Sequence, residues 1–332
     1  MISETKKFNW GILGAGKIAG KFATDLALLP NANLYAVGSR SFEKAKDFAN
    51  QYQFEKAYGS YEELLDDPQL DVVYIATPNS EHFRHSLLAL EKGVAVLCEK
   101  PLALNSKEVN LMIEKAKETN TFLMEALWTL FLPHMLKVQE LIAERVIGEV
   151  QSVRSDFGFL AKFDPQHRLF NPALGGGALL DIGIYPLLLA QSILGVPDRI
   201  SATAILGETK VDEDINIALT YGNKKIAHLQ ATLRSITPLD THIYGTKGYI
   251  YLPNRWHKPV PYIRVHDYGS SQDIRYEMPT DVLGYKFEAR AVMECLDAGL
   301  TENPIASWQF SSDLMKTMDT IRKQVGVGYA VD

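Results

Sequence analysis

The chain has 332 residues, and its 34 lysines and arginines against 40 aspartates and glutamates give a formal net charge of -6. Hydrophobic residues make up 46% and charged residues 22%, which predicts a folded protein with room for two cores rather than a disordered chain. A mildly acidic chain without long runs of like charge gives no electrostatic basis for binding nucleic acid or an anionic membrane, so we expect neither partner.

The cysteines and the N-terminal segment suggest where the protein works. Cys98 and Cys295 are too few for a disulfide framework, and we expect reduced, buried thiols. Beyond His82 and His85, the histidines lack metal-ligand spacing, so no metal is expected. The first residues lack the pattern of a secretion signal, and we see no segment of about 20 uninterrupted apolar residues. The expectation is a soluble, cytoplasmic protein.

The first 125 residues alternate short apolar segments with amphipathic helices. The apolar segments cover residues 10–13, 34–37, 71–76, 94–97 and 121–124. Helix starts are marked by pairs of polar residues three apart, Ser60 with Glu63 and Asn105 with Glu108, which can satisfy free amides of the first turn. This alternation is typical of a parallel sheet with helices on both faces. It predicts an α/β fold, with a doubly wound Rossmann domain over residues 1–125.

Beyond about Glu149 the hydrophobic pattern changes. Residues 214–221 and 225–233 alternate apolar and polar positions, which indicates half-buried strands of an antiparallel sheet. Helices are predicted over residues 180–194, 285–298 and 310–324. Residues 126–332 are therefore predicted to form an α+β domain with a large, mostly antiparallel sheet that is open on one face.

A glycine-rich sequence, Gly14-Ala15-Gly16-Lys17-Ile18-Ala19, follows the first predicted strand and opens the next helix. In such a G-x-G-x-x-G/A pattern the first glycine makes a tight turn and the second lets a pyrophosphate approach the backbone. The phosphate then lies at the helix N-terminus, where free amides and the helix dipole favour an anion. A purely structural turn is the alternative, but the order of strand, motif and helix favours a dinucleotide site.

The end of the second predicted strand bears on which dinucleotide is bound. Where an NAD site usually carries an acidic residue, this chain has Ser39, Arg40 and Ser41, with Lys44 one turn later. The Arg40 guanidinium can form paired hydrogen bonds to a 2′-phosphate, and the serines can donate others. The prediction is NADP(H), with NAD less favoured. The alternative is a solvated Arg40 beside a serine that only caps a helix.

Three further segments carry a family resemblance. They are Thr77-Pro78-Asn79, Glu99-Lys100-Pro101, and the stretch from Gly175 to Pro186 that contains Asp181 and Tyr185. With the glycine pattern, they resemble the Gfo/Idh/MocA oxidoreductase family over essentially the whole chain. The resemblance implies a C-terminal domain that binds substrate and a homodimer or homotetramer formed through its sheet. Tyr185 followed by Pro186 is similar to members that oxidise cyclic diols or aldoses with NADP, although Leu130 replaces their arginine.

Hydride transfer from an alcohol requires a base for the hydroxyl proton. Tyrosine, with an unperturbed pKa of about 10, is a poor base near neutrality, but a nearby ammonium stabilises its phenolate. We expect Tyr185 to be the proton acceptor or donor, Lys100 to activate it, and Asp181 to hold Lys100 and orient the substrate. Asp181 shares a face with Tyr185 if the segment is helical, although Pro186 disfavours a regular helix. The alternatives are a surface lysine, a helix-start carboxylate and a core tyrosine.

Other candidate residues surround this predicted centre. The predicted cofactor-binding residues are Gly14, Ala15, Gly16, Lys17, Ile18, Ser39, Arg40, Ser41, Lys44, Thr77, Pro78, Asn79, His82, Glu99 and Lys100. The predicted substrate-binding residues are Trp128, Arg168, Asp181 and Tyr185. The alternatives are a structural turn at Thr77–Asn79, a structural role for His82, a core position for Trp128 and a solvated Arg168.

These predictions combine into an NADP(H)-dependent oxidoreductase that moves hydride between the nicotinamide and a carbon of a sugar or cyclic diol. One alternative is a regulator that binds NADP(H) or a sugar without chemistry, but it would have little reason to keep Lys100, Asp181 and Tyr185 together. Another is an enzyme like glucose-fructose oxidoreductase that keeps its cofactor bound. Such enzymes usually carry an export signal and an N-terminal arm, and neither is evident in the sequence.

Overall fold

The computed structural model describes residues 6–222, 224–280 and 282–332. The chain folds into two compact units. The first comprises the residues up to Trp128 together with Leu283–Ser312, and the second comprises Thr129–Val282 and Asp313–Asp332. The return of Leu283–Ser312 to the first unit was not anticipated from the sequence, because nothing in a local hydrophobic pattern says which sheet a late helix joins.

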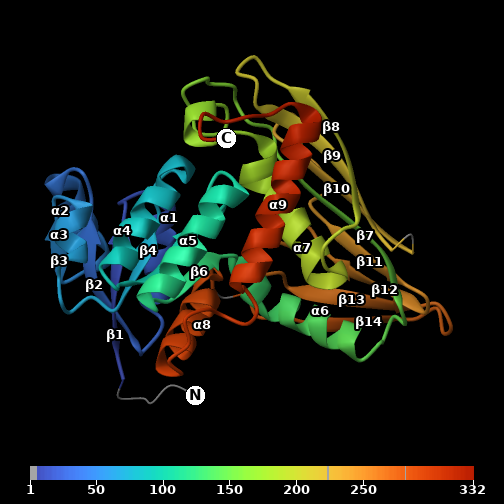
Figure 1. Cartoon of the computed structure of the whole chain (residues 1–332). Coiled ribbons are helices and arrows are strands. Elements are labelled where there is room, and N and C mark those ends of the chain that lie inside the picture. The colour runs from blue at the N-terminus through green and yellow to red at the C-terminus, as the bar shows by residue number, and fades with distance from the viewer. Residues whose placement is uncertain (1–5, 223, 281) are drawn as a thin grey trace. The chain divides into compact units, whose positions relative to one another are not determined.

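The first unit contains a parallel sheet of six strands in its described part (Figure 1). The strand order is β3 (Lys56–Tyr58), β2 (Ala32–Gly38), β1 (Phe8–Leu13), β4 (Val72–Ile75), β5 (Ala95–Glu99), β6 (Leu123–Ala126). Because β1 lies between β2 and β4, the chain changes direction across the sheet at β1. Ligands of open α/β sheets bind at this point, beyond the carboxyl ends of the strands. The predicted Rossmann fold is confirmed.

Helices pack against this sheet in two groups. One group is α1 (Lys17–Leu26), α2 (Phe42–Tyr52) and α8 (Tyr285–Asp297), and the other is α4 (His82–Glu91) and α5 (Ser106–Thr119). A short helix, α3 (Tyr61–Leu65), packs on β2 and β3. Both predicted caps are confirmed: the amide of Glu63 donates to Ser60 Oγ at 3.1 Å, and that of Glu108 to Asn105 Oδ1 at 2.9 Å.

A buried carboxylate fixes the start of α8. Asp25, on α1, is 1% exposed and accepts hydrogen bonds from the amides of Leu283, Gly284 and Lys286 at 3.2, 2.7 and 3.2 Å. These are amides that a helix start leaves without partners inside the helix. A side chain from the first helix of the unit therefore determines where the returning segment begins its own helix.

The second unit contains a sheet of eight strands in its described part (Figure 1). The order is β14 (Asp273–Glu277), β13 (Tyr262–Asp267), β12 (Gly248–Leu252), β11 (Thr241–Gly245), β7 (Val150–Gly158), β10 (Lys225–Thr232), β9 (Asp212–Tyr221), β8 (Arg199–Leu206). The β7–β10 pair is parallel and the other pairs are antiparallel. The predicted mostly antiparallel sheet is confirmed.

One face of this sheet is covered by an apolar helical segment. A 3-10 turn at Pro172–Leu174 and a π-helical turn at Leu179–Gly183 precede α7 (Ile184–Leu194), which packs on β7 and β10. By length and composition alone, residues 172–194 could cross a membrane, with a mean hydropathy of 1.6, but 89% of the most apolar window is buried within the protein. The burial accounts for the apolar composition, because this helix forms the core beneath the sheet. The sequence predicted a helix over residues 180–194, but not that the longer stretch is apolar enough to pass as a membrane span.

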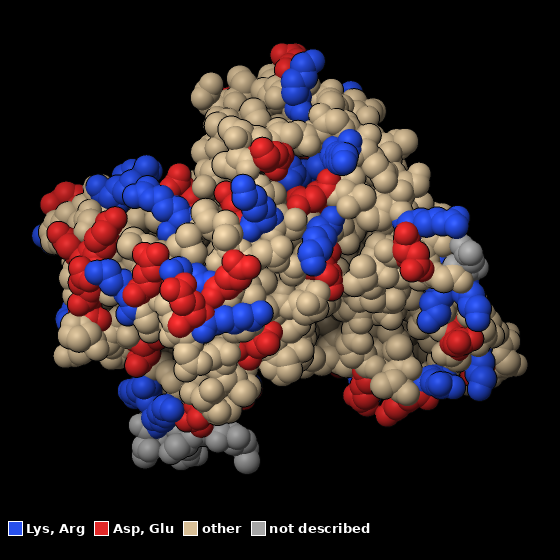
Figure 2. All heavy atoms as spheres, in the orientation of Figure 1, with Lys and Arg blue, Asp and Glu red and all other residues tan. Residues whose placement is uncertain are grey.

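The remaining elements complete the two units. The 3-10 turn Trp128–Phe131 joins β6 to α6 (Pro133–Ala143), and α9 (Trp308–Val325) ends the helical part of the chain. Cys98 and Cys295 are free and buried, as predicted. On the face shown in Figure 2, lysines and arginines are interspersed with aspartates and glutamates, in agreement with the near balance of charges in the sequence.

Candidate active site

The predicted glycine turn joins β1 to α1. Gly14 has φ +98°, and its amide donates to the Gly38 carbonyl at 3.0 Å. A Cβ there would lie 3.0 Å from the Ala76 carbonyl oxygen, so both conformation and space require glycine. Gly16 differs, since a Cβ on it would meet no atom within 4 Å. It begins α1 without a capping side chain, and the first turn carries no acidic residue. Open space over free amides is the arrangement that accepts a phosphate.

The segment after β2 presents a cation beside two locally bonded serines. The amide of Ser41 donates to Ser39 Oγ at 3.3 Å, and that of Lys44 donates to Ser41 Oγ at 3.5 Å, so Ser41 caps α2. Both hydroxyls accept in these contacts, which leaves their own hydrogens available for an outside acceptor. The side chains of Arg40 and Lys44 are exposed. Ser41 therefore has the helix-capping role that sequence analysis gave as its alternative, and this role is compatible with a ligand contact.

The loops after β4 and β5 are joined by a buried histidine. His82 Nδ1 lies 2.8 Å from the Pro101 carbonyl oxygen, and Nε2 lies 2.9 Å from that of Thr77. The ring is fully buried, and burial lowers the pKa of His82 to about 4. These contacts give His82 the structural role that the sequence named as its alternative. It holds the loops of Thr77–Asn79 and Glu99–Pro101 in a fixed relation.

Two buried carboxyl groups hold the segment that carries Lys100. The hydroxyl of Tyr74 donates to Glu99, whose other oxygen accepts from the Lys100 amide at 3.2 Å. Glu125 accepts from the Leu102 amide at 2.9 Å, and burial raises the pKa of Glu125 to about 7. Glu99 is 8% exposed and Lys100 is half-buried. The core of the first unit thus fixes the backbone on both sides of Lys100, and the Lys100–Pro101 peptide is cis.

Trp128 has an aromatic partner that the sequence did not indicate. Its ring stacks on Tyr285 of α8, with centroids 4.6 Å apart, and it is 4% exposed. This placement matches the alternative of a buried tryptophan. Tyr285 follows the helix start that Asp25 fixes, so the stack depends on the returning segment.

The predicted chemical residues of the second unit lie on the helical segment beneath its sheet. Asp181 belongs to the π-helical turn, and Tyr185 to the first turn of α7. The sequence suggested a regular helix or a kink near Pro186. The π-helical turn just before Pro186 accommodates a residue that donates no amide hydrogen and crowds the carbonyl four residues earlier. Arg168 Nη1 lies 2.5 Å from Asp181 Oδ1, an ion pair that the sequence did not predict.

Two aromatic residues around Tyr185 were also missed. Phe157 stacks on His257 with ring centroids 4.0 Å apart. The Tyr185 ring lies 5.4 Å from Phe157 and 5.3 Å from His257. Phe157 comes from β7, and His257 from the segment between β12 and β13, so no sequence spacing could have connected them to Tyr185. The three rings form one cluster, in which the Phe157–His257 stack lies against the Tyr185 ring.

Comparison with known proteins identifies the family. Residues 8–127 match the model described as the oxidoreductase family, NAD-binding Rossmann fold, and residues 135–251 match the GFO/IDH/MocA C-terminal domain. The trans-1,2-dihydrobenzene-1,2-diol dehydrogenase of Xenopus laevis is 38% identical over 96% of this chain and 98% of its own. The human enzyme of that name is 33% identical over 97% and 98%. The chain belongs to the Gfo/Idh/MocA oxidoreductase family.

Solved structures of this fold agree over nearly the full length. An aldose-aldose oxidoreductase from Caulobacter crescentus, complexed with glycerol, has a TM-score of 0.88 and 25% identity, covering 97% of this chain and 98% of its own. A 3-ketoreductase from Actinomadura kijaniata, in complex with NADP and TDP-benzene, has a TM-score of 0.86 and 25% identity, covering 96% and 98%. A levoglucosan dehydrogenase with NADH and levoglucosan shares the fold, with a TM-score of 0.88 at 21% identity over 97% and 98%.

Substitutions at Gly16 and Gly14 test the glycine turn of this Gfo/Idh/MocA protein, and each variant is a control for the other. Gly16→Val places a branched side chain in the open space over the first amides of α1. It should lower NADPH affinity at least about tenfold, or about 1.4 kcal/mol, with little change in Tm. Gly14→Ala should instead lower Tm, because its methyl group meets the Ala76 carbonyl. Fluorescence titration and thermal unfolding measure the two effects. Unchanged NADPH affinity in Gly16→Val would contradict this placement of the phosphates.

Proposed function

We propose that this protein is an NADP(H)-dependent oxidoreductase that transfers hydride between the nicotinamide and a CH–OH carbon of a sugar or cyclic diol. The observation that carries the proposal is Tyr185 held beside Asp181 at the start of one buried helix, in a chain with a Rossmann cofactor domain. Relatives named for a cyclic diol, and neighbours solved with glycerol or levoglucosan, support a polyhydroxylated substrate. A regulator without chemistry and an enzyme with permanently bound cofactor remain the competing proposals.

The proposed chemistry assigns a proton to Tyr185. When bound, the nicotinamide would supply the hydride acceptor for a carbinol carbon in oxidation and the hydride donor for a carbonyl carbon in reduction. Tyr185 takes the hydroxyl proton in oxidation and returns it in reduction, so the alcohol loses one hydride and one proton as its C=O bond forms. Lys100 stabilises the phenolate electrostatically. Asp181, paired with Arg168, accepts hydrogen bonds from substrate hydroxyls and orients the reacting carbon.

The preference for NADP(H) rests on the segment after β2. No acidic residue stands among Ser39, Arg40 and Ser41 to repel a 2′-phosphate, and Arg40 is exposed there. A guanidinium forms paired, charge-assisted hydrogen bonds with phosphate oxygens. The two serine hydroxyls keep their hydrogens for the same anion, since their oxygens accept from the backbone.

The role of Tyr185 has a direct test. Tyr185→Phe removes the acid/base hydroxyl and keeps the ring against Phe157 and His257, so NADP+-dependent turnover should fall about 10²- to 10⁴-fold with NADPH affinity unchanged. Tyr221→Phe, which removes another buried hydroxyl of the same unit, is the matched control. Nicotinamide absorbance with a panel of aldoses, inositols and cyclic diols measures turnover. Full activity in Tyr185→Phe would remove Tyr185 from the mechanism, and wild-type protein that binds NADPH but turns over none of the panel would favour a regulator.

Arg40→Ala tests the cofactor preference. Loss of hydrogen bonds to a charged phosphate should weaken NADP(H) binding about 10- to 100-fold and leave NAD(H) binding nearly unchanged. Lys46→Ala, an exposed position on α2, is the control and should alter neither affinity. Equal losses for the two cofactors in Arg40→Ala would show that Arg40 does not recognise the 2′-phosphate.

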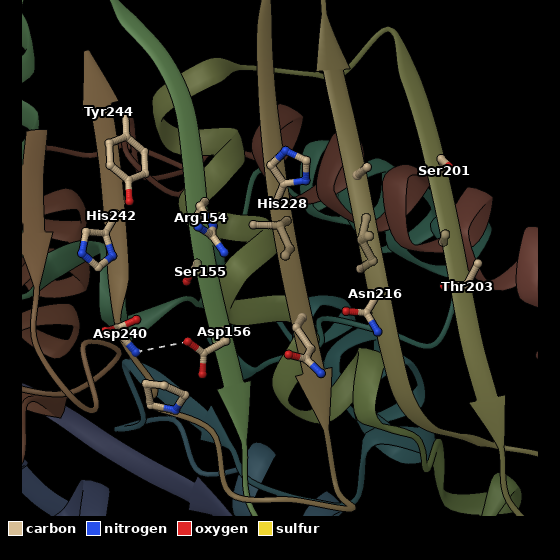
Figure 3. Close-up of a pocket in the computed structure, with 16 residues that line it drawn as sticks. Arg154, Ser155, Asp156, Ser201, Thr203, Asn216, His228, Asp240, His242 and Tyr244 are labelled. Carbon is tan, nitrogen blue, oxygen red and sulfur yellow. Dashed lines mark hydrogen bonds between the residues drawn. The ribbon is translucent and has the colours of Figure 1, made fainter.

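We further propose that the protein forms a homodimer or homotetramer through the open face of the eight-stranded sheet. Figure 3 shows side chains of five neighbouring strands on this face, around a hollow of about 580 Å³. The labelled residues include Arg154, Asn216, His228, Asp240 and His242. The family resemblance implies association through this sheet, and a broad sheet face offers two copies a matching surface.

A charge at the centre of this face should oppose association. Ala218 lines the hollow, and Ala218→Glu places one carboxylate from each copy in a self-complementary interface. We expect a shift toward monomer in sedimentation equilibrium, while the exposed control Lys46→Glu keeps the wild-type mass. A wild-type monomer, or an Ala218→Glu variant with the wild-type mass, would contradict the proposed interface.

A further inference from the structure

Asp212, at the start of β9, is a buried carboxylate with no role in the chemistry proposed above. It is fully buried, and its Oδ2 accepts a hydrogen bond from the Leu179 amide at 2.6 Å. Its Oδ1 has no hydrogen-bond partner among the described residues. Leu179 is the first residue of the π-helical turn that carries Asp181. A strand of the sheet therefore supplies the acceptor for a free amide at the start of the helical segment with the proposed chemical residues.

The backbone at Gly177 is shaped around this carboxylate. Gly177 has φ +127°, and a Cβ on it would lie 2.4 Å from Asp212 Oδ1. Any side chain at this position would have to displace the carboxylate, and the positive φ disfavours every other residue. The Gly177 carbonyl in turn accepts from the Asp181 amide at 3.3 Å. Asp212 thus contacts the turn at Leu179 and packs against Gly177, the residue whose carbonyl accepts from the Asp181 amide.

A second group holds the same turn from the C-terminal segment. The Tyr329 hydroxyl donates to the Gly176 carbonyl at 2.6 Å and would lie 3.4 Å from a Cβ on Gly177. The Tyr329 amide donates to Asp332, which pairs with Arg322 of α9. Asp212 and Tyr329 therefore bind backbone groups on either side of Gly177, the Leu179 amide and the Gly176 carbonyl.

The electrostatic environment of Asp212 indicates that a carboxyl group is needed at this position. Burial raises the pKa of Asp212 to about 7, while the Leu179 amide and the charge of Arg322 favour the ionised form. A carboxyl group buried without a direct ion pair among the described residues costs folding free energy unless its hydrogen bonds offset the lost hydration. The hydrogen bond from the Leu179 amide is the contact that offsets part of this cost for Asp212.

We propose that Asp212 is a positioning residue, which with Tyr329 sets the start of the helical segment and thereby the places of Asp181 and Tyr185. This inference rests on the proposed function of those two residues. Asp212 touches neither substrate nor cofactor in this role. Its loss changes the alignment of the acid/base group, which affects the chemical step more than cofactor binding.

Three variants and a control test the proposal. Asp212→Ala removes the acceptor, Asp212→Asn keeps an oxygen for the Leu179 amide, and Tyr329→Phe removes one hydroxyl from the other side of the turn. Tyr221→Phe is the control, because its hydroxyl lies on the same strand β9 and has no hydrogen-bond partner among the described residues. The readouts are kcat, KM for NADP+, and hydrogen exchange of peptides that cover residues 176–187.

We expect Asp212→Ala to lower kcat about tenfold or more, since small misplacements of a reacting group have effects of this size. KM for NADP+ should stay within about twofold, and amides of residues 177–183 should exchange faster. Asp212→Asn should restore part of the lost kcat and part of the lost protection from exchange. Tyr329→Phe should show the same pattern, and it decides the question if Asp212→Ala does not fold. Tyr221→Phe should match the wild type.

Two results would overturn the inference. Wild-type exchange in Asp212→Ala and Tyr329→Phe would show that these groups do not hold the turn. Faster exchange with unchanged kcat would show that the turn is held but does not position the chemistry. Full turnover in Tyr185→Phe would instead refute the proposed function, and hydrogen exchange, which needs no substrate, would still report whether Asp212 holds the helix.

Discussion

The free amides at the start of a helix need acceptors, and in this protein the way each start is satisfied determines where functional groups lie. At α1 the acceptor is left to a ligand, because Gly16 opens the space above the amides and no side chain caps them. At α8 the acceptor is the buried carboxylate of Asp25, from the first helix of the same unit. At the π-helical turn of the second unit it is Asp212, from the start of strand β9.

Buried polar contacts of this kind cost folding free energy unless they are fully satisfied, and the chain concentrates them near its candidate site residues. Glu99, Glu125 and His82 fix the loops on either side of Lys100. Glu288 of α8 is fully buried without a hydrogen-bond partner among the described residues, and burial and the charge of Glu99 raise its pKa. Glu99 and Glu125 thus hold the strand ends of the first unit, whereas Glu288 makes no such contact among the described residues.

The sequence predicts local features well in this chain. The glycine turn, the caps at Ser60 and Asn105, the two kinds of sheet and the helix that carries Tyr185 follow from spacing and periodicity, because each is encoded within a few residues. The contacts that hold Tyr185 could not be predicted. Phe157, His257 and Asp212 lie on other strands or loops, and only the paired register of the sheet brings them to α7 and its preceding turn. The π-helical turn itself depends on Pro186, whose effect the sequence predicts only as an irregularity.

The central claim is that Tyr185 exchanges a proton with the substrate hydroxyl. Two crystal structures test it most directly. One is the unreactive Tyr185→Phe variant with NADP+ and a turnover substrate, and the other is the wild-type protein with a non-reacting polyol. We predict a ligand hydroxyl about 3 Å from Tyr185 Oη in the wild type, and the reacting hydroxyl of the substrate at the same place in the variant. A ligand whose hydroxyls lie away from Tyr185 and Asp181, in protein that is active under the same conditions, would contradict it.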